Sequence, residues 1–201
     1  MTSETATGDM IAEDHEIPNE SEFGFWLYLM SDAILFGLIF ATYAVMVSNT
    51  AGGPSGADLF SLENLTTQTA FLLTSTLTIA LSHQATVAKN TGAALGWLVA
   101  TCVLGGGFLV FELRELGDMI AQGAGPMRSG FLSAFFTLVG THGLHVTMGL
   151  LWAVTMMAQL AIKGPTARVT SRLLRLTLFW HFLDIVWIGV FSVIYLPGLS
   201  G

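Results

Sequence analysis

The sequence contains little charge. Only 10% of its 201 residues are Asp, Glu, Lys or Arg, whereas an ordinary soluble domain has about 25%. Hydrophobic residues make up 53% of the chain. A water-soluble globular domain is therefore excluded, and a lipid bilayer is the expected solvent.

The chain also lacks cysteine pairs and the common catalytic motifs. The single cysteine, Cys102, lies within an apolar run and excludes an internal disulfide or a cysteine-rich metal site. It is interpreted as a small packing residue. There is no Walker loop, Rossmann glycine motif, nucleophile elbow or zinc-protease motif. The N-terminus has no basic region followed by an apolar run, so no cleavable signal peptide is predicted.

What the chain does contain is five long apolar runs. A membrane span needs about 20 apolar residues, because the hydrocarbon core is about 30 Å thick and a helix rises about 1.5 Å per residue. The runs cover residues 23–47, 65–88, 93–113, 131–162 and 173–196. Short Gly, Pro and Asn segments separate them. We therefore predict an all-α polytopic membrane protein, a bundle of five transmembrane helices over residues 23–201.

An acidic segment of 22 residues precedes the first span. It contains seven acidic residues and no Lys or Arg, and it accounts for the whole formal net charge of −7. Its composition predicts a solvated and largely disordered tail. The acidic residues are Glu4, Asp9, Glu13, Asp14, Glu16, Glu20 and Glu22.

The distribution of Lys and Arg predicts the orientation. With five spans, the N-terminal tail shares a membrane side with the second and fourth connections. That side has five basic residues, Lys89, Lys163, Arg168, Arg172 and Arg175, and the other has two, Arg114 and Arg128. Because Lys and Arg are retained on the cytoplasmic side, we expect a cytoplasmic N-terminus and a periplasmic C-terminus.

Six ionisable residues inside the runs need an explanation, because such groups in hydrocarbon cost several kcal/mol unless they are paired. Asp32 is nine residues into the first span, about 14 Å deep. His142 and His145 share a face of the fourth span, as His181 and Asp184 do in the fifth. Glu112 ends a stripe that also contains Trp97, Thr101, Gly105 and Phe108. We predict that these six residues form a buried polar framework, with Asp32 paired to histidines at a similar depth.

Two of these sets of residues, His142 with His145 and Asp32 with His181 and Asp184, each allow two interpretations. His142 and His145 have the spacing of two metal ligands, but no third ligand of metal-site spacing supports them, which favours a structural hydrogen bond between helices. Asp32, His181 and Asp184 can form a proton relay or a network that only fixes helix packing. His83, near the inner end of the second span, can reach the membrane interface and is not assigned a role.

Small and hydroxylated residues indicate how the helices pack. Close helix approach in membranes uses small residues, and glycines are frequent in the third and fourth spans: Gly105, Gly106, Gly107, Gly140, Gly143 and Gly149. The second span is rich in threonine, and such hydroxyls can bond to carbonyls of their own helix.

Four stretches of the chain resemble subunit III of haem-copper terminal oxidases, in particular the bacterial cytochrome bo-type ubiquinol oxidases. They are FGFWLYLMSD at 23–32 with FATYA at 40–44, TAGGP at 50–54, RSGFLSAFF at 128–136 with GTHGLHV at 140–146, and FWHFLDIVW at 179–187. The family has seven-helix members and shorter five-helix members. The five predicted spans fit the shorter form.

The resemblance implies a non-catalytic subunit of an oxidase in the bacterial inner membrane. Haem and copper are then expected in partner subunit I, with no cofactor or metal in this chain, and no nucleic-acid partner is expected. The implied roles are complex assembly and stability, binding of phospholipid, and support of proton uptake during quinol oxidation and oxygen reduction. Asp32 stands where many relatives have a buried glutamate, so the shorter side chain leaves a proton role open.

Three alternatives remain open. The first is subunit III of a cytochrome c oxidase, whose electron donor is cytochrome c instead of ubiquinol. No residue of this sequence indicates a contact with either donor. A small transporter or channel is allowed by polar residues at the midplane, although the sequence has no internal repeat. A metal-dependent membrane enzyme would use His142 and His145.

Overall fold

The computed structural model describes residues 5–52 and 62–195, with the side chains of residues 22–52 and 64–195. Its elements are the α-helices α1 (Thr5–Met46), α3 (Leu62–Val87), α4 (Thr91–Ala121), α5 (Gly130–Lys163) and α6 (Ala167–Val190), followed by the π-helix η1 (Phe191–Tyr195). No strand occurs in these residues. The predicted all-α fold is confirmed.

The chain divides into two compact parts, Met1–Gly37 and Leu38–Gly201. The first part consists of the N-terminal portion of α1. Its helical backbone begins at Thr5, within the segment whose composition predicts disorder, and its apolar span begins at Glu22. The side chains of residues 1–21 lie outside the described residues, so solvation of the acidic tail stays a prediction.

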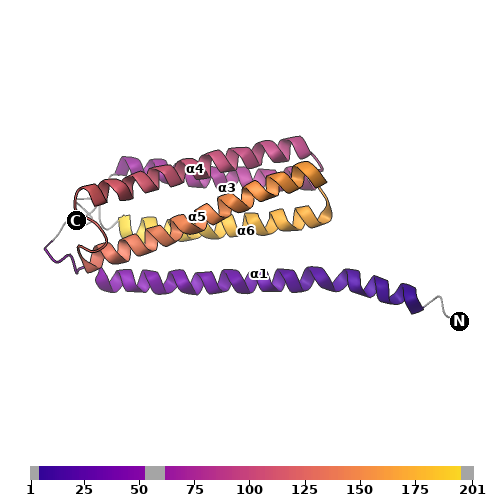
Figure 1. Cartoon of the computed structure of the whole chain (residues 1–201), viewed down its shortest axis with the longest axis horizontal. Helices are drawn as coiled ribbons and strands as arrows, with labels where there is room; N and C mark the ends of the chain where they lie inside the picture. Colours follow the sequence, from indigo (N-terminus) through magenta and orange to yellow (C-terminus); the bar gives the residue numbers. More distant parts are fainter. Residues whose placement is uncertain (1–4, 53–61, 196–201) are drawn as a thin grey trace. The chain divides into compact units, whose positions relative to one another are not determined.

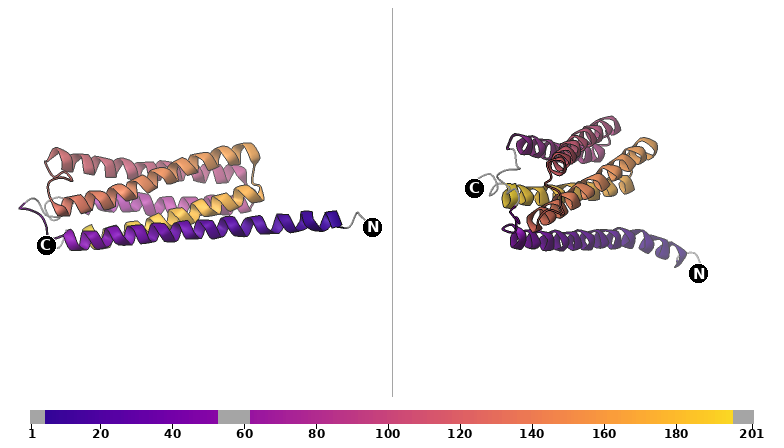
Figure 2. Two further views of the ribbon diagram at one scale, coloured as in Figure 1. Left: turned by 60° about the horizontal axis from the view of Figure 1, so that its bottom comes forward. Right: turned by 60° about the vertical axis from the view of Figure 1, so that its left-hand side comes forward.

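The second part is a bundle in which α3, α4, α5 and α6 each contact two of the others. The contacting pairs are α3 with α4, α4 with α5, α5 with α6, and α6 with α3. Figures 1 and 2 show these four helices lying side by side, with the connections at residues 88–90 and 164–166 at one end and the connection at residues 122–129 at the other. The last turns of α1 also belong to this part, where the Tyr43 and Phe131 rings lie 6.0 Å apart.

Four helices are long and apolar enough to cross a membrane: Glu22–Met46, Thr91–Ala121, Gly130–Lys163 and Ala167–Tyr195. The fifth, α3, has 26 residues, which is enough to span about 30 Å. Its hydroxyl groups lower its mean hydropathy, but several of them bond to its own carbonyls, such as Thr69 to Leu65 at 2.8 Å and Thr86 to Ser82 at 2.9 Å. These internal bonds reduce the cost of hydroxyls in lipid.

Helix ends follow local capping chemistry. Asn90, Ser129 and Thr166 each accept a hydrogen bond from a backbone N–H of the first turn of α4, α5 and α6. Gly164 ends α5 with φ of 68°, a left-handed conformation that glycine adopts without a Cβ clash. Two boundaries differ from the apolar runs. Helix α4 continues for eight residues beyond its run, through a segment that contains Arg114, Glu115 and Asp118, and α6 begins six residues earlier than its run, at the Thr166 cap.

Glycines and aromatic rings determine the closest helix contacts. A Cβ at Gly105 of α4 would lie 2.8 Å from the Trp180 ring of α6, and a Cβ at Gly149 of α5 would lie 2.9 Å from the same ring. Gly106 and Gly140 have no neighbour within 4 Å of a built Cβ. The predicted role of the glycines in close packing is thus confirmed for Gly105 and Gly149 and is wrong for Gly106 and Gly140.

Candidate functional site

Glu112 and Glu115 place two carboxyl groups at the junction of α3, α4 and α5. Glu112 is 3% exposed, and a Cβ at Gly143 of α5 would lie 2.9 Å from its Oε1 atom. Glu115, one turn further along α4, accepts a 2.5 Å hydrogen bond from Nε2 of Gln68 on α3. Among the described residues, Glu112 Oε2 and Gln68 Oε1 are buried without a hydrogen-bond partner. The absent side chain of Gly143 makes room for the Glu112 carboxyl group.

The stripe expected to end at Glu112 is mostly buried. Thr101, Gly105 and Phe108 are inside the bundle with Glu112, while Trp97 is 39% exposed. The stripe therefore faces other helices, and Trp97 lies at its edge.

His142 connects α5 to α6. Its Nε2 atom donates to the Leu183 carbonyl oxygen over 3.3 Å, since a carbonyl can only accept. The ring is fully buried, with Phe108 edge-on at 5.6 Å and Trp187 at 5.2 Å. Nδ1 is buried without a partner among the described residues. The arrangement is a helix–helix hydrogen bond enclosed by aromatic rings.

His145 and His181 share a different arrangement. Nδ1 of His145 donates to the Thr141 carbonyl at 2.8 Å, and Nδ1 of His181 donates to the Thr177 carbonyl at 2.7 Å. Each bond spans one turn of its own helix, which fixes the tautomer and leaves Nε2 as the acceptor. His142 and His145 thus use different ring nitrogens, His142 toward α6 and His145 toward its own helix.

Asp184 lies on α6 and is 6% exposed. The Thr76 hydroxyl of α3 is its hydrogen-bonding partner. Asp184 Oδ1 is buried without a partner in the described part of the chain. This contact joins α6 to α3 within the membrane.

Asp32 lies on α1, one helical turn after Tyr28, and the two side chains are hydrogen-bonded. Both belong to the part Met1–Gly37, whereas the histidines belong to Leu38–Gly201. The predicted pairing of Asp32 with histidines of α5 and α6 therefore stays a prediction.

Within residues 5–52 and 62–195, no group of three or more His, Cys, Asp or Glu side chains is arranged to hold a metal ion. Two of the three histidine rings described above bond along their own helix, and His142 bonds to α6.

Sequence reasoning missed the contribution of α3. Ser75 Oγ accepts a 2.9 Å hydrogen bond from Trp180 Nε1, and Thr69 Oγ1 accepts one of 3.1 Å from Trp187 Nε1. Thr78 and Thr101 hydroxyls lie 2.8 Å apart. The threonine-rich composition was a usable signal, since hydroxyls that donate to their own helix still have lone pairs free for a neighbouring helix.

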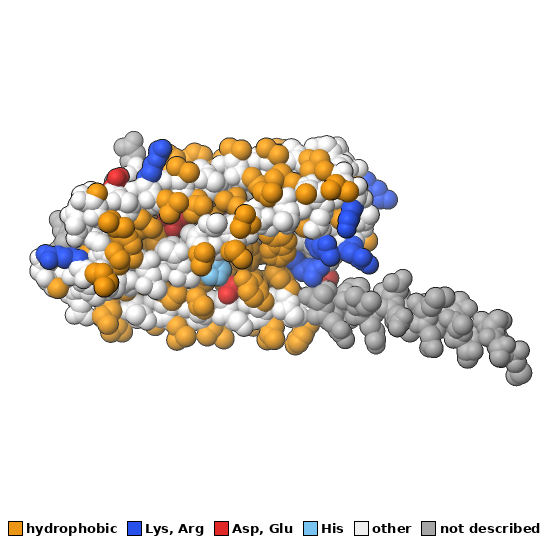
Figure 3. Space-filling model, viewed as in Figure 1, with side chains coloured by type: hydrophobic (Ala, Val, Ile, Leu, Met, Phe, Trp, Pro, Cys, Tyr) orange, Lys and Arg blue, Asp and Glu red, His pale blue; other side chains and the backbone are white. Residues whose placement is uncertain are grey.

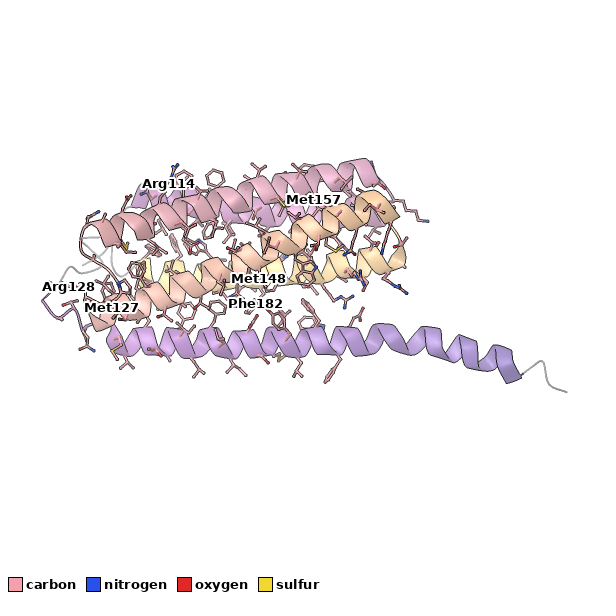
Figure 4. All side chains as sticks on the ribbon, viewed as in Figure 1. Arg114, Met127, Arg128, Met148, Met157 and Phe182 are labelled. Atoms are coloured by element: carbon pink, nitrogen blue, oxygen red, sulfur yellow. The ribbon has the colours of Figure 1, made fainter. Side chains whose placement is uncertain are left out.

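The basic residues separate along the bundle as the charge count predicts. Lys89 and Lys163 lie at the connections 88–90 and 164–166, at one end. Figure 4 shows Arg128 at the opposite end and Arg114 on α4 toward that same end.

The chain matches the family model "Cytochrome c oxidase subunit III" over residues 7–199. It is 49% identical to cytochrome bo(3) ubiquinol oxidase subunit 3 of Pseudomonas aeruginosa, covering 98% of this chain and 97% of the relative. It is 50% identical to the protein of the same name from Pseudomonas putida, covering 92% and 89%. It is also 41% identical to cytochrome c oxidase subunit 3 of Bacillus sp. (strain PS3), covering 89% and 86%.

Proposed function

Because this chain belongs to the cytochrome c oxidase subunit III family, we propose that it is subunit III of a proton-pumping, haem-copper ubiquinol oxidase. The enzyme oxidises ubiquinol, reduces oxygen to water and lies in the bacterial inner membrane. The observation that carries the proposal is the similarity, over nearly the whole chain, to relatives named as ubiquinol oxidase subunit 3.

In this proposal the chain is not catalytic. Haem and copper are held by another chain, subunit I, and the histidines described here support helix packing. The hydrogen bond from His142 on α5 to the Leu183 carbonyl on α6 favours this assignment. The chain contributes to assembly and stability of the complex and to lipid association.

We extend the proposal to proton uptake. Buried carboxyl groups with a free oxygen, Glu112 and Asp184, are suited to hold a proton or an ordered water molecule. Asp32, near the membrane midplane, is hydrogen-bonded to Tyr28 on the same helix. These groups support, rather than carry out, proton transfer into subunit I.

Copurification tests the proposal. Affinity-tagged chain, solubilised in mild detergent, is expected to bring down partner subunits with a haem absorption spectrum and ubiquinol oxidase activity. Recovery of the tagged chain without haem-containing partners would contradict it. Metal analysis of the separated chain is expected to give substoichiometric iron, copper and zinc.

Asp32→Ala tests the proton-linked part. The variant is expected to weaken subunit association or to shorten the time over which the oxidase sustains turnover, because it removes the carboxyl group that Tyr28 contacts. Asp32→Asn, which keeps the shape and removes the acid, separates loss of packing from loss of proton exchange. Full subunit content with undiminished sustained pumping in both variants would refute the role of Asp32.

A cytochrome c oxidase is the second candidate, since one relative has that name. Turnover of the purified complex with ubiquinol or with reduced cytochrome c separates the two.

A transporter or channel is the candidate from another class of function. If the chain is an oxidase subunit, its reconstitution in liposomes is expected to give no ion flux. A metal-dependent enzyme is tested by the metal analysis above.

A further inference from the structure

Two carboxyl groups and one amide lie together where α3 packs against α4. Glu112 and Glu115 are three residues apart on α4, so they share a face of that helix, and the charge of Glu115 acts on the Glu112 carboxyl group. From α3, Gln68 donates through Nε2 to Glu115 Oε2 at 2.5 Å. The amide end of Gln68 is thus turned toward the carboxyl groups of α4.

Two oxygen atoms of this cluster have no hydrogen bond. Among the described residues, Glu112 Oε2 and Gln68 Oε1 are buried without a partner, and the two residues are only 3% and 1% exposed. Oε1 of Gln68 is attached to the same carbon as the Nε2 atom that bonds to Glu115, so it lies beside the carboxyl groups. A carboxylate oxygen and an amide oxygen are both acceptors. The cluster therefore needs a positive species that interacts with several oxygen atoms.

The two carboxylates also have no counter-ion in the described part of the chain. Neither Glu112 nor Glu115 has a Lys, Arg or His partner there. Arg114 is adjacent in sequence but exposed, and Figure 4 shows it on the outer side of α4. Figure 3 shows Lys and Arg side chains gathered at the opposite end of the bundle. Carboxylates that leave water without a positive charge destabilise the fold.

A proton and a metal cation are the two species that supply positive charge to such a cluster. One proton on Glu112 would balance one of the two charges and leave that of Glu115. A divalent cation balances both charges and contacts several oxygen atoms at once. Charge balance thus favours a divalent cation.

The available ligand atoms are oxygens. Within residues 5–52 and 62–195, no third His, Cys, Asp or Glu joins the pair, so the nitrogen and sulfur ligands that zinc and copper prefer are missing. Calcium accepts carboxylates through one or both oxygens, together with amide carbonyls and water, in a flexible geometry. Magnesium requires a stricter octahedral geometry and keeps several waters. Three side chains from two helices are therefore better suited to calcium.

The cluster lies near a membrane surface. The apolar run of α4 ends at residue 113, and the helix continues to Ala121, at the end of the bundle with the connection 122–129. Glu115 is half-buried, while Glu112 and Gln68 are buried on its inner side. An ion thus reaches Glu115 from the predicted periplasmic side without crossing the bilayer.

We propose that Glu112, Glu115 and Gln68 form a calcium site that links α3 to α4 near the predicted periplasmic surface. The two carboxylates balance the charge of the ion, the Gln68 carbonyl oxygen is a third ligand, and water completes the about 6–8 oxygen atoms that calcium takes. With so few protein ligands, the expected dissociation constant is about 10⁻⁴–10⁻³ M, as in extracellular calcium modules. The site adds a metal to a chain for which the family resemblance implies none, and it leaves the proton-holding role proposed for buried carboxyl groups to Asp184.

Equilibrium dialysis of the purified complex against radioactive calcium tests the site. The wild-type complex is expected to bind one more calcium ion per chain than Glu112→Gln, which keeps the side-chain shape and removes one charge. Asp118→Asn is the matched control, because it removes a carboxylate from an exposed position of the same helix, and it is expected to bind as much calcium as the wild type. Equal losses in both variants, or no loss in Glu112→Gln, would overturn the proposal.

Thermal unfolding of the wild-type complex is a second test that needs no variant. With calcium about tenfold above its dissociation constant, the melting temperature of the subunit is expected to lie about 3–6 °C higher than with a calcium chelator. Magnesium at the same concentration is expected to have a smaller effect. An unchanged melting temperature would assign the balancing charge to a proton and overturn the proposal, as would an equal shift with magnesium.

Discussion

Trp180 is the residue on which three helices converge. Its indole is fully buried, it donates to Ser75 on α3, and it fills the space left by Gly105 on α4 and Gly149 on α5. Contacts from α3, α4 and α5 thus restrict the position of the indole ring. Small residues opposite it are therefore required by shape, not by backbone freedom.

Gly149→Ala is expected to destabilise the subunit by about 1–3 kcal/mol, because the added Cβ would lie 2.9 Å from the Trp180 ring. Thermal unfolding of the purified complex in detergent measures the change. Gly140→Ala, on the same helix with no neighbour within 4 Å, is the control. It is expected to leave stability unchanged or raise it by about 0.5–1 kcal/mol, because alanine is the better helix former. Similar loss in both variants would contradict this account.

Gln68 on α3 donates a hydrogen bond to the Glu115 carboxyl group on α4. Gln68→Leu leaves a partly buried acceptor without its partner, at an expected cost of about 1–3 kcal/mol. Loss of the subunit from the complex with increasing denaturant is the readout. Gln84→Leu makes the same replacement at an exposed position of the same helix and is expected to have little effect. An unchanged midpoint in Gln68→Leu would refute the role of this bond.

The hydroxyl groups of α3 form hydrogen bonds both within their own helix and to α6. Its hydroxyls donate to carbonyls of the same helix, such as Ser75 to Leu72 at 2.6 Å, and accept from tryptophans of α6. A hydroxyl has one donor and two acceptor lone pairs, so both bonds form at once. The helix of lowest hydropathy thus gives the tryptophans of α6 their hydrogen-bond acceptors.

Ser75→Ala removes the acceptor of the Trp180 indole and leaves a buried N–H unpaired. We expect a loss of about 1–3 kcal/mol in the free energy of unfolding. Thr74→Ala, at the neighbouring exposed position, serves as the control and is expected to change stability by less than about 0.5 kcal/mol. Equal behaviour of the two variants would mean that the indole bond contributes nothing measurable.

The sequence predicted the helices but not their partners. Apolar runs locate the spans because the bilayer imposes length and composition. They do not reveal that α4 continues to Ala121, since charged residues such as Arg114, Glu115 and Asp118 interrupt the apolar sequence of its last turns. Which glycine faces a ring depends on helix rotation, so Gly105 and Gly140 look alike in sequence and differ in the bundle. In the candidate site, burial of Glu112 followed from its stripe, whereas Gln68 could not be found because its partner is 47 residues away.

On the scale of the whole molecule, charge differs between the two ends of the bundle. The charge count assigns five basic residues to one membrane side and two to the other. Of the five, Arg168, Arg172 and Arg175 lie in the first turns of α6. We expect the end with Lys163 in the cytoplasm and the end with Arg128 in the periplasm.

Cysteine labelling tests this orientation. In a Cys102→Ser background, Met127→Cys is expected to react with a membrane-impermeant maleimide in intact cells, because Met127 is 98% exposed at the connection 122–129 (Figure 4). Lys163→Cys is expected to react only after the cells are permeabilised. The reverse pattern would invert the proposed topology.

The short turn between α3 and α4 has a consequence for how the protein is made. Only residues 88–90 separate the two helices, and α3 alone falls short of the hydropathy at which the other four helices qualify as spans. We expect the translocon to release α3 into lipid together with the more apolar α4, as one helical hairpin, rather than as an independent segment. Biogenesis of the subunit then depends on the spacing of these two helices, because a long insertion in the turn would leave α3 to enter the bilayer alone.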